Sequence, residues 1–300
     1  GLDVNEKDFW DGFDKSINEL APINKKLLEV RETLQSEIDL WLKKNRNGEF
    51  NHQEYKNFLK EIGYLKEEGN DFKIDTKKLD SEISSIAGPQ LVVPIMNSRY
   101  TLNAANARWV SLYDSLYGTD LIESEETGSQ KYDPLRGQEV IRYAREFLND
   151  HFSINEIHWK DINGFKIKGS DLKILKDDKE FELVDKNKFI GYRGEPNNPT
   201  TIILENNNLK IEIIINPKAF SAVQDAAGIS DIIIESAIST ICDNEDSVAA
   251  VDSEDKILCY RNWLGLMKGT LKSVFEKDGK TLERKLNPDR SYISKDNKKE

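Results

Sequence analysis

An uninterrupted apolar run at residues 91–96 constrains the fold of this chain more than any other feature. Gly88 and Pro89 bound it on the amino-terminal side. Such a run is typical of a strand buried on both faces, as in a parallel sheet or a barrel. Pro94 has no N–H to donate to a strand ladder, so we expect the strand to end there.

A second apolar run ends in a group of acids within residues 231–247. We expect an amphipathic helix here that runs into a short strand. On an extended chain Asp243, Glu245 and Ser247 project to one side. Active sites of barrels and open α/β sheets lie at the carboxyl ends of strands, and paired carboxylates suit the water shell of Mg²⁺ or an arginine network. An acidic, solvated loop is the alternative interpretation, and the spacing alone does not decide between the two.

The first part of the chain, residues 1–66, has apolar side chains at intervals of three and four, which is the helical period. Pro22 fits the first turn of a second helix, where its missing N–H costs nothing. Residues 45–48 carry a stop signal of Asn and Gly. We therefore expect a structural helical cap, followed by a polar linker at residues 67–87.

Residues 157–216 change to short runs of β character. Two of these runs, at 200–205 and 209–215, flank three consecutive asparagines. Because asparagine tolerates positive φ, the triplet predicts a hairpin turn. The whole block is predicted to be a small, mostly antiparallel α/β domain.

Composition narrows the class of function. The chain has 54 acidic and 43 basic side chains and a net charge of −11, which argues against a nucleic-acid binder, because phosphate neutralisation needs clustered cations in excess. No apolar run reaches the roughly 18 residues that span a bilayer. The two cysteines are too few for a disulfide scaffold. We expect a cytoplasmic protein that binds neither nucleic acid nor membrane.

Four long segments are the most specific part of the sequence: GPQLVVPIMNSRYTLNAANARW at 88–109, CDNEDSVAAVDSEDK at 242–256, YRNWLGLMKG at 260–269 and RKLNPDR at 284–290. These segments resemble malate synthase of the G isoform. Weaker similarity reaches the amino-terminal helices and residues 191–194, so that the resemblance covers nearly the whole chain.

The resemblance implies a Mg²⁺-dependent acyltransferase of the glyoxylate cycle, which condenses acetyl-CoA with glyoxylate and water to give malate and CoA. It also implies that the chain is only the N-terminal portion of such an enzyme. The essential arginine, the direct Mg²⁺ ligands and the catalytic aspartate are all expected beyond Glu300, with no metal ligand in this chain. We expect the 300 residues alone to be inactive, and the complete enzyme to be a monomer.

The fold implied by the resemblance is α/β, with a helical clasp, the first strands of a TIM (β/α)₈ barrel and an inserted small α/β domain. The barrel is expected to be incomplete in this chain. The expected divisions are the clasp at 1–66, a linker and first barrel strand at 67–108, the inserted domain at 109–230, a second barrel strand and helix with the acidic segment at 231–268, and a return into the α/β domain at 269–300.

The resemblance also implies roles for individual residues. Residues expected to bind acetyl-CoA are Val92, through a backbone group to the adenine, Arg99, through a phosphate, and Tyr100, Ser247 and Arg284. Without the resemblance, a surface ion pair is the favoured interpretation of Arg99, a core position that of Tyr100 and a solvated basic face that of Arg284. Asp243 and Glu245 are expected to support catalysis near the water shell of the metal rather than to bind the metal directly.

A different class of function stays open beside the enzyme. The alternative is a non-catalytic module that binds CoA or acts by protein interaction through its helices. The natural length of the chain and the affinity of the 300 residues for CoA separate the two hypotheses.

Overall fold

The computed structural model describes residues 3–123, 132–223, 225–247, 249–277, 279–296 and 298–300. The chain divides into two compact units, Gly1–Thr76 and Lys77–Glu300, which are described separately below. None of the helices in the described residues is both long enough and apolar enough to cross a membrane.

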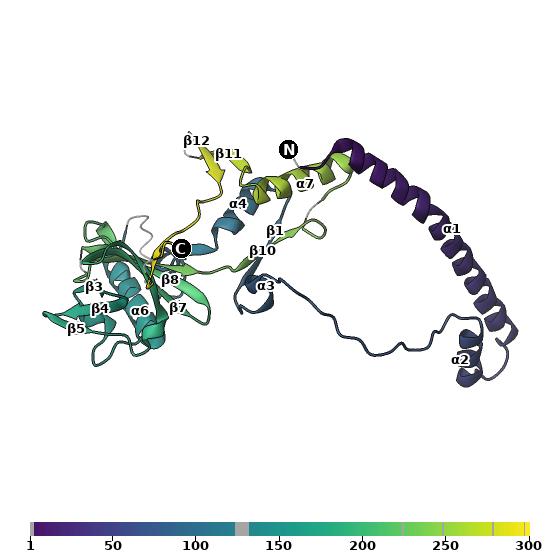
Figure 1. Cartoon of the computed structure of the whole chain (residues 1–300), viewed down its shortest axis with the longest axis horizontal. Coiled ribbons are helices and arrows are strands. Elements are labelled where there is room, and N and C mark those ends of the chain that lie inside the picture. Colours follow the sequence, from purple (N-terminus) through teal and green to yellow (C-terminus); the bar gives the residue numbers. More distant parts are fainter. Residues whose placement is uncertain (1–2, 124–131, 224, 248, 278, 297) are drawn as a thin grey trace. The chain divides into compact units, whose positions relative to one another are not determined.

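The first unit contains two helices, α1 (Glu6–Lys44) and α2 (His52–Glu61) (Figure 1). The Asn5 side chain caps the start of α1, and Asn45 ends it at the predicted stop signal. Trp41 of α1 lies over Phe58 of α2, with ring centroids 5.6 Å apart, and so holds the two helices together.

The expectation that Pro22 opens a second helix is wrong, because Pro22 lies inside the continuous helix α1. The fixed φ of proline is already helical, so Pro22 can stay within the helix without a change in the direction of the chain. Its cost is one lost backbone hydrogen bond and some steric strain. No residue of α1, all of which the structure describes, is buried. Its exposed apolar side chains include Phe9, Trp10, Phe13, Ile17, Leu20, Ile23, Leu27, Leu28 and Val30.

The second unit begins with α3 (Ser81–Ser84), β1 (Gln90–Pro94) and α4 (Ser98–Asn106). The later segments β10 (Ser239–Asp243) and α7 (Ser253–Met267) return beside them. β1 and β10 pair in parallel, in a register that joins Gln90 to Ser239 and Pro94 to Asp243. The predicted strand and its end at Pro94 are confirmed.

Burial of β1 on both faces is not observed in the described residues. Val93 is buried, whereas Val92 is 64% exposed and its cross-strand partner Ile241 is 49% exposed. The reason is that β1 and β10 form a sheet of only two strands, which is covered on one face.

The α/β domain is built on a six-stranded sheet in the order β13-β6-β7-β8-β9-β2, and every neighbouring pair is antiparallel. The prediction of a mostly antiparallel α/β domain is confirmed. In chain order its strands are β2 (Trp109–Ser111), β6 (Phe189–Glu195), β7 (Asn198–Asn206), β8 (Leu209–Ile215), β9 (Ile229–Glu235) and β13 (Ile293–Ser294).

Helices α5 (Leu112–Gly118) and α6 (Pro134–His151) share one hydrophobic core with this sheet. Leu148 of α6 and Ile202, Ile213 and Ile232 of the sheet are completely buried in that core. A second sheet of β3 (Gly164–Lys168), β4 (Asp171–Lys176) and β5 (Lys179–Phe181) adds to it. Short 3₁₀ turns lie at Trp159–Asp161, Lys186–Lys188 and Phe220–Ala222, and the separate hairpin β11 (Lys272–Lys277) and β12 (Lys280–Lys285) follows α7.

Two local predictions in the 200–235 region have opposite outcomes. The asparagine hairpin is confirmed, since Asn207 and Asn208 have φ of 53° and 63° and connect β7 to β8. The amphipathic helix expected from residue 231 is wrong, because this stretch belongs to strand β9. Its consecutive β-branched isoleucines favour a strand, and pairing with β8 on one edge and β2 on the other determines the outcome.

Candidate functional site

The carboxyl ends of the two parallel strands define the candidate site. Pro94 and Asp243 are register partners there, and the Ile95 amide donates to the Asp243 carbonyl at 3.0 Å. An open cavity of about 480 Å³ lies beyond them, lined by Pro94, Met96, Asn97, Ser98, Ser247 and Ala249. The structure therefore brings Ser247 next to the connection between β1 and α4, where ligands of parallel α/β sheets are expected.

Asp243 organises the loop that follows β10. Its Oδ1 accepts from the Glu245 amide at 3.0 Å and its Oδ2 from the Ser247 amide at 2.7 Å. Hydrogen bonding by the Ser247 side chain and by these two amides lowers the pKa of Asp243 to about 2. The carboxylate is thus ionised at neutral pH and is directed toward its own loop, whereas Glu245 is exposed.

Three of the predicted CoA contacts lie on β1 and the first turn of α4. The side chain of Asn97 caps α4 by accepting from the Tyr100 amide at 3.1 Å. Tyr100 is 54% exposed, and Val92 lies on the uncovered face of β1. The Arg99 guanidinium lies over the Phe275 ring, 4.1 Å from its centroid. A core position of Tyr100 and an ion pair of Arg99 were the alternative interpretations without the resemblance, and neither is found in the described residues.

Arg284 lies on β12, opposite Ser273 of β11, while Phe275 lies opposite Leu282. Opposed residues of an antiparallel pair point to one face, and so do residues two apart on a strand. Arg284 therefore projects from the same face of the hairpin as Phe275, on which Arg99 rests. The two arginines share a surface, although neither of them lines the cavity beside Ser247.

The described residues contain no group of three or more His, Cys, Asp or Glu side chains arranged to hold a metal ion. Both oxygens of Asp243 already accept backbone hydrogen bonds. The residues present do not fit a direct Mg²⁺ site, and the geometry supports no chemical step through the ion.

Sequence reasoning missed the residues that fix the loops of the site. The Asn262 amide, buried in α7, donates to the carbonyls of Ile95 and Met96, both at 3.0 Å. Lys256, also on α7, donates to the Asn244 carbonyl at 2.9 Å. The sequence feature that could have indicated Asn262 is its spacing of three residues from Cys259, which places both on the inward face of one helix.

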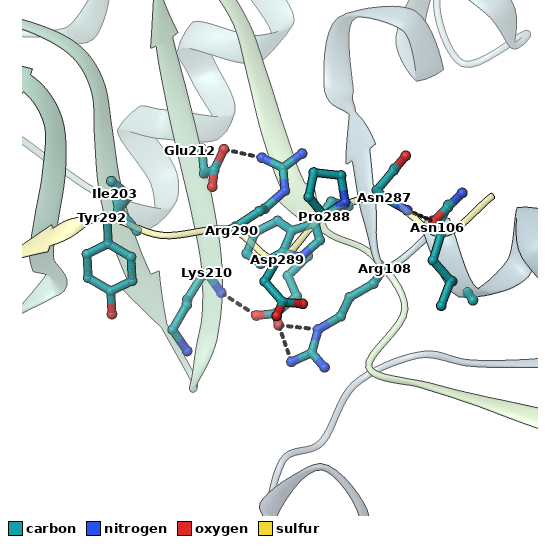
Figure 2. A pocket seen from close by; sticks show the side chains of 14 residues that line it. Asn106, Arg108, Ile203, Lys210, Glu212, Asn287, Pro288, Asp289, Arg290 and Tyr292 are labelled. Carbon is teal, nitrogen blue, oxygen red and sulfur yellow. Dashed lines mark hydrogen bonds and ion pairs between the residues drawn. The ribbon is translucent and has the colours of Figure 1, made fainter. Parts of the chain in front are cut away.

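A second cavity of about 510 Å³ lies between the sheet and the returning segment 286–292 (Figure 2). Glu212, only 2% exposed, accepts there from Arg193 and Arg290. Glu235 accepts from Arg108 at 2.7 Å and from the Lys210 amide at 2.9 Å. The sequence signal for this network was Glu212, a lone acid between Ile211 and Ile213. Because side chains alternate along a strand and both isoleucines face the helix-covered core, Glu212 points to the opposite face of the sheet.

Comparison with known proteins gives the same assignment along the chain. Residues 132–206 match the family described as malate synthase G, alpha-beta insertion domain, and residues 1–51 match malate synthase, N-terminal domain. A protein named malate synthase G from Halalkalibacterium halodurans is 46% identical over 298 residues, which cover 98% of this chain and 41% of the relative.

Proteins of the same name from two corynebacteria are equally similar. That of Corynebacterium glutamicum is 45% identical over 97% of this chain and 40% of its own length, and that of Corynebacterium efficiens is 44% identical over 97% and 39%. The chain thus spans about two fifths of the length of these relatives. The chain therefore matches an N-terminal portion of proteins of the malate synthase G family.

Proposed function

We propose that this chain is the acetyl-CoA-binding, N-terminal part of a malate synthase. The complete enzyme condenses acetyl-CoA with glyoxylate and water to give malate and CoA, as a step of the glyoxylate cycle. The observation that carries this proposal is 44–46% identity to proteins named malate synthase G along nearly the whole chain.

The proposed CoA contacts keep the roles that the resemblance implies. A backbone group of Val92 bonds the adenine, Arg99 pairs with a phosphate, and Tyr100, Ser247 and Arg284 complete the binding surface. The shared hairpin face of Arg99 and Arg284 supports this assignment, because guanidinium groups bind phosphates through directed, charge-assisted hydrogen bonds. Two local cations are sufficient for a phosphate-bearing ligand even in a chain of net charge −11.

Magnesium enters the proposal only for the complete enzyme, where it would polarise glyoxylate. We assign its direct ligands, together with the catalytic aspartate and the essential arginine, to the part of the enzyme beyond Glu300. Asp243 and Glu245 support the active site without binding the ion. The 300 residues alone are accordingly inactive.

The proposed fold of the complete enzyme is a TIM barrel to which β1 and β10 contribute the first two strands. The exposed cross-strand pair of Val92 and Ile241 supports this, because parallel strands are normally covered on both faces. The exposed apolar side chains of α1 support a helical clasp that packs on another part of the enzyme. The domain divisions given above, a cytoplasmic location and a monomeric state, with neither nucleic acid nor membrane as partner, belong to the same proposal.

The test is glyoxylate-dependent release of CoA thiol by the full-length protein. Arg99→Ala and Arg284→Ala are each expected to raise the KM for acetyl-CoA by about 10-fold or more, the value of a lost charge-assisted hydrogen bond. Arg142→Ala is the matched control, since Arg142 is an exposed arginine of α6 that forms ion pairs with Glu139 and Glu146 of the same helix. Absence of CoA release by the wild type would overturn the proposed activity, and equal KM changes in all three variants would overturn the assignment of the site.

A CoA titration of the 300-residue chain addresses the alternative function. Half of a CoA site is expected to bind weakly. Micromolar affinity without any turnover would favour the non-catalytic CoA-binding module instead.

A further inference from the structure

Helix α4 is attached to the hairpin β11–β12 at both of its ends. Near its start, the Arg99 guanidinium lies over the Phe275 ring of β11. At its last residue, the Asn106 side chain binds the backbone at the end of β12 and just after it. Its Nδ2 donates to the Lys285 carbonyl at 3.0 Å. Its Oδ1 accepts from the Asn287 amide at 2.9 Å, as Figure 2 shows.

The Asn106 amide thus uses a donor and an acceptor on backbone groups two residues apart. An asparagine suits this task because it carries both functions on one short, rigid plane. Aspartate offers only acceptors, and alanine offers neither. Arg284 directly precedes Lys285, so the segment held by Asn106 is continuous with the strand that carries Arg284.

We infer that Asn106 is a positioning residue for the binding of CoA, which sets the separation of Arg99 and Arg284. The inference rests on the proposed function for the identity of the ligand. Arg99 is seven residues before Asn106 on the same helix, so the helix transmits the anchoring of its last turn to the guanidinium in its first turn. Neither polar atom of the Asn106 amide is needed to touch the ligand.

A residue of this kind is expected to affect affinity for acetyl-CoA and not the chemical step. With both hydrogen bonds lost, Asn106→Ala is expected to raise the KM for acetyl-CoA about 5- to 30-fold, because one ordinary hydrogen bond corresponds to about fivefold in an equilibrium constant. The kcat and the KM for glyoxylate are expected to stay within about twofold of the wild type, because no reacting atom is displaced.

The experiment uses the full-length enzyme with three variants. Asn106→Ala removes both hydrogen bonds. Asn106→Asp keeps the acceptor for the Asn287 amide and loses the donor to Lys285, so its KM is expected to lie between those of the wild type and the alanine variant. Asn103→Ala is the matched control, because Asn103 is an exposed asparagine of the same helix whose side chain makes no hydrogen bond to the described residues.

Amide hydrogen exchange gives a second measurement that does not depend on turnover. The Asn287 amide is expected to exchange faster in Asn106→Ala than in the wild type, and to remain protected in Asn106→Asp and Asn103→Ala. An unchanged KM for acetyl-CoA despite faster exchange at Asn287 would overturn the positioning role. A fall in kcat with an unchanged KM would overturn it as well.

The outcomes separate this inference from the proposed function. If the wild type releases no CoA from acetyl-CoA and glyoxylate, the proposed activity fails, and the inference is then decided by calorimetric titration with CoA. Weaker CoA binding by Asn106→Ala than by Asn103→Ala would support Asn106 as a positioning residue, whereas equal affinities would overturn it.

Discussion

Substitution of Glu212 is expected to destabilise the α/β domain strongly. Glu212 lies on β8, on the sheet face away from α5 and α6, and its carboxylate is 2% exposed. Arg193 binds both carboxylate oxygens. Arg290 binds Oε2, as Figure 2 shows. Arg193 also donates to the Ser291 carbonyl at 2.6 Å, so this group connects the sheet to the returning segment.

The magnitude follows from burial of the partners. Removing one member of a buried ion pair costs about 3–5 kcal/mol, because the other charge is left without compensation. The side chains of Arg193 and Arg290 are 28% and 35% exposed, so water can partly replace the lost carboxylate. We therefore expect Glu212→Ala to cost about 3 kcal/mol, at the lower end of that range. Glu212→Gln retains the shape and one acceptor and is expected to cost about 1–2 kcal/mol.

Thermal unfolding of the protein, followed by circular dichroism, measures this. For a unit of this size a loss of 3 kcal/mol corresponds to a Tm lower by about 6–12 °C. Glu205→Ala is the matched control, since Glu205 on the neighbouring β7 makes a half-exposed ion pair with Lys210, expected to contribute about 0.2–1 kcal/mol. Equal Tm values for Glu212→Ala and Glu205→Ala would refute the reasoning from burial.

Three further predictions concern local structure. Because the folded pKa of Asp243 is lowered from 3.8 to about 2, its stabilisation of the 243–247 turn is present above pH 3.8 and lost as the pH falls toward 2. The protection factor of the Ser247 amide, which is its exchange rate relative to the intrinsic rate at the same pH, should fall accordingly, and Asp243→Asn should remove this pH dependence. Asn208→Ala is expected to cost about 1 kcal/mol in urea unfolding, since alanine tolerates a φ of 63° poorly, whereas Asn208→Gly should not be destabilising. Pro22→Ala is expected to stabilise α1 by up to about 3 kcal/mol and to slow amide exchange around it; unchanged exchange would contradict a hydrogen-bonding cost at Pro22.

Features determined by a single residue and its neighbours could be predicted from the sequence. The end of β1 follows from the missing N–H of Pro94, and the β7–β8 turn from the tolerance of asparagine for positive φ. The expected helix at 231–235 failed for a different reason. Its apolar pattern fits a helix or a strand, and the edges of β8 and β2, far away in sequence, decide in favour of the strand.

The positions that hold the candidate site together could not be predicted in the same way. Asn106 and Asn262 are ordinary polar residues within helices, and their partners Lys285 and Ile95 lie 179 and 167 residues away. The structural role of such an amide side chain depends on which backbone groups the folded chain brings within hydrogen-bonding distance of it. The resemblance to a family could suggest candidate ligand-binding residues, but not the side chains that anchor the segments carrying them.

The two edges of the six-stranded sheet set an order for folding during synthesis. β2, at one edge, leaves the ribosome before every other strand of the sheet, and β13, at the opposite edge, leaves after all of them. Until residues 293–294 emerge, the outer edge of β6 has no partner strand from this sheet and is open to pairing with other chains. Gly191 on β6 leaves room for β13 to pair, because a Cβ at this position would lie 2.5 Å from the Ile293 carbonyl oxygen. A nascent chain halted before β13 thus exposes this edge of β6, and β13 itself pairs with only Tyr192 and Gly191 of that strand.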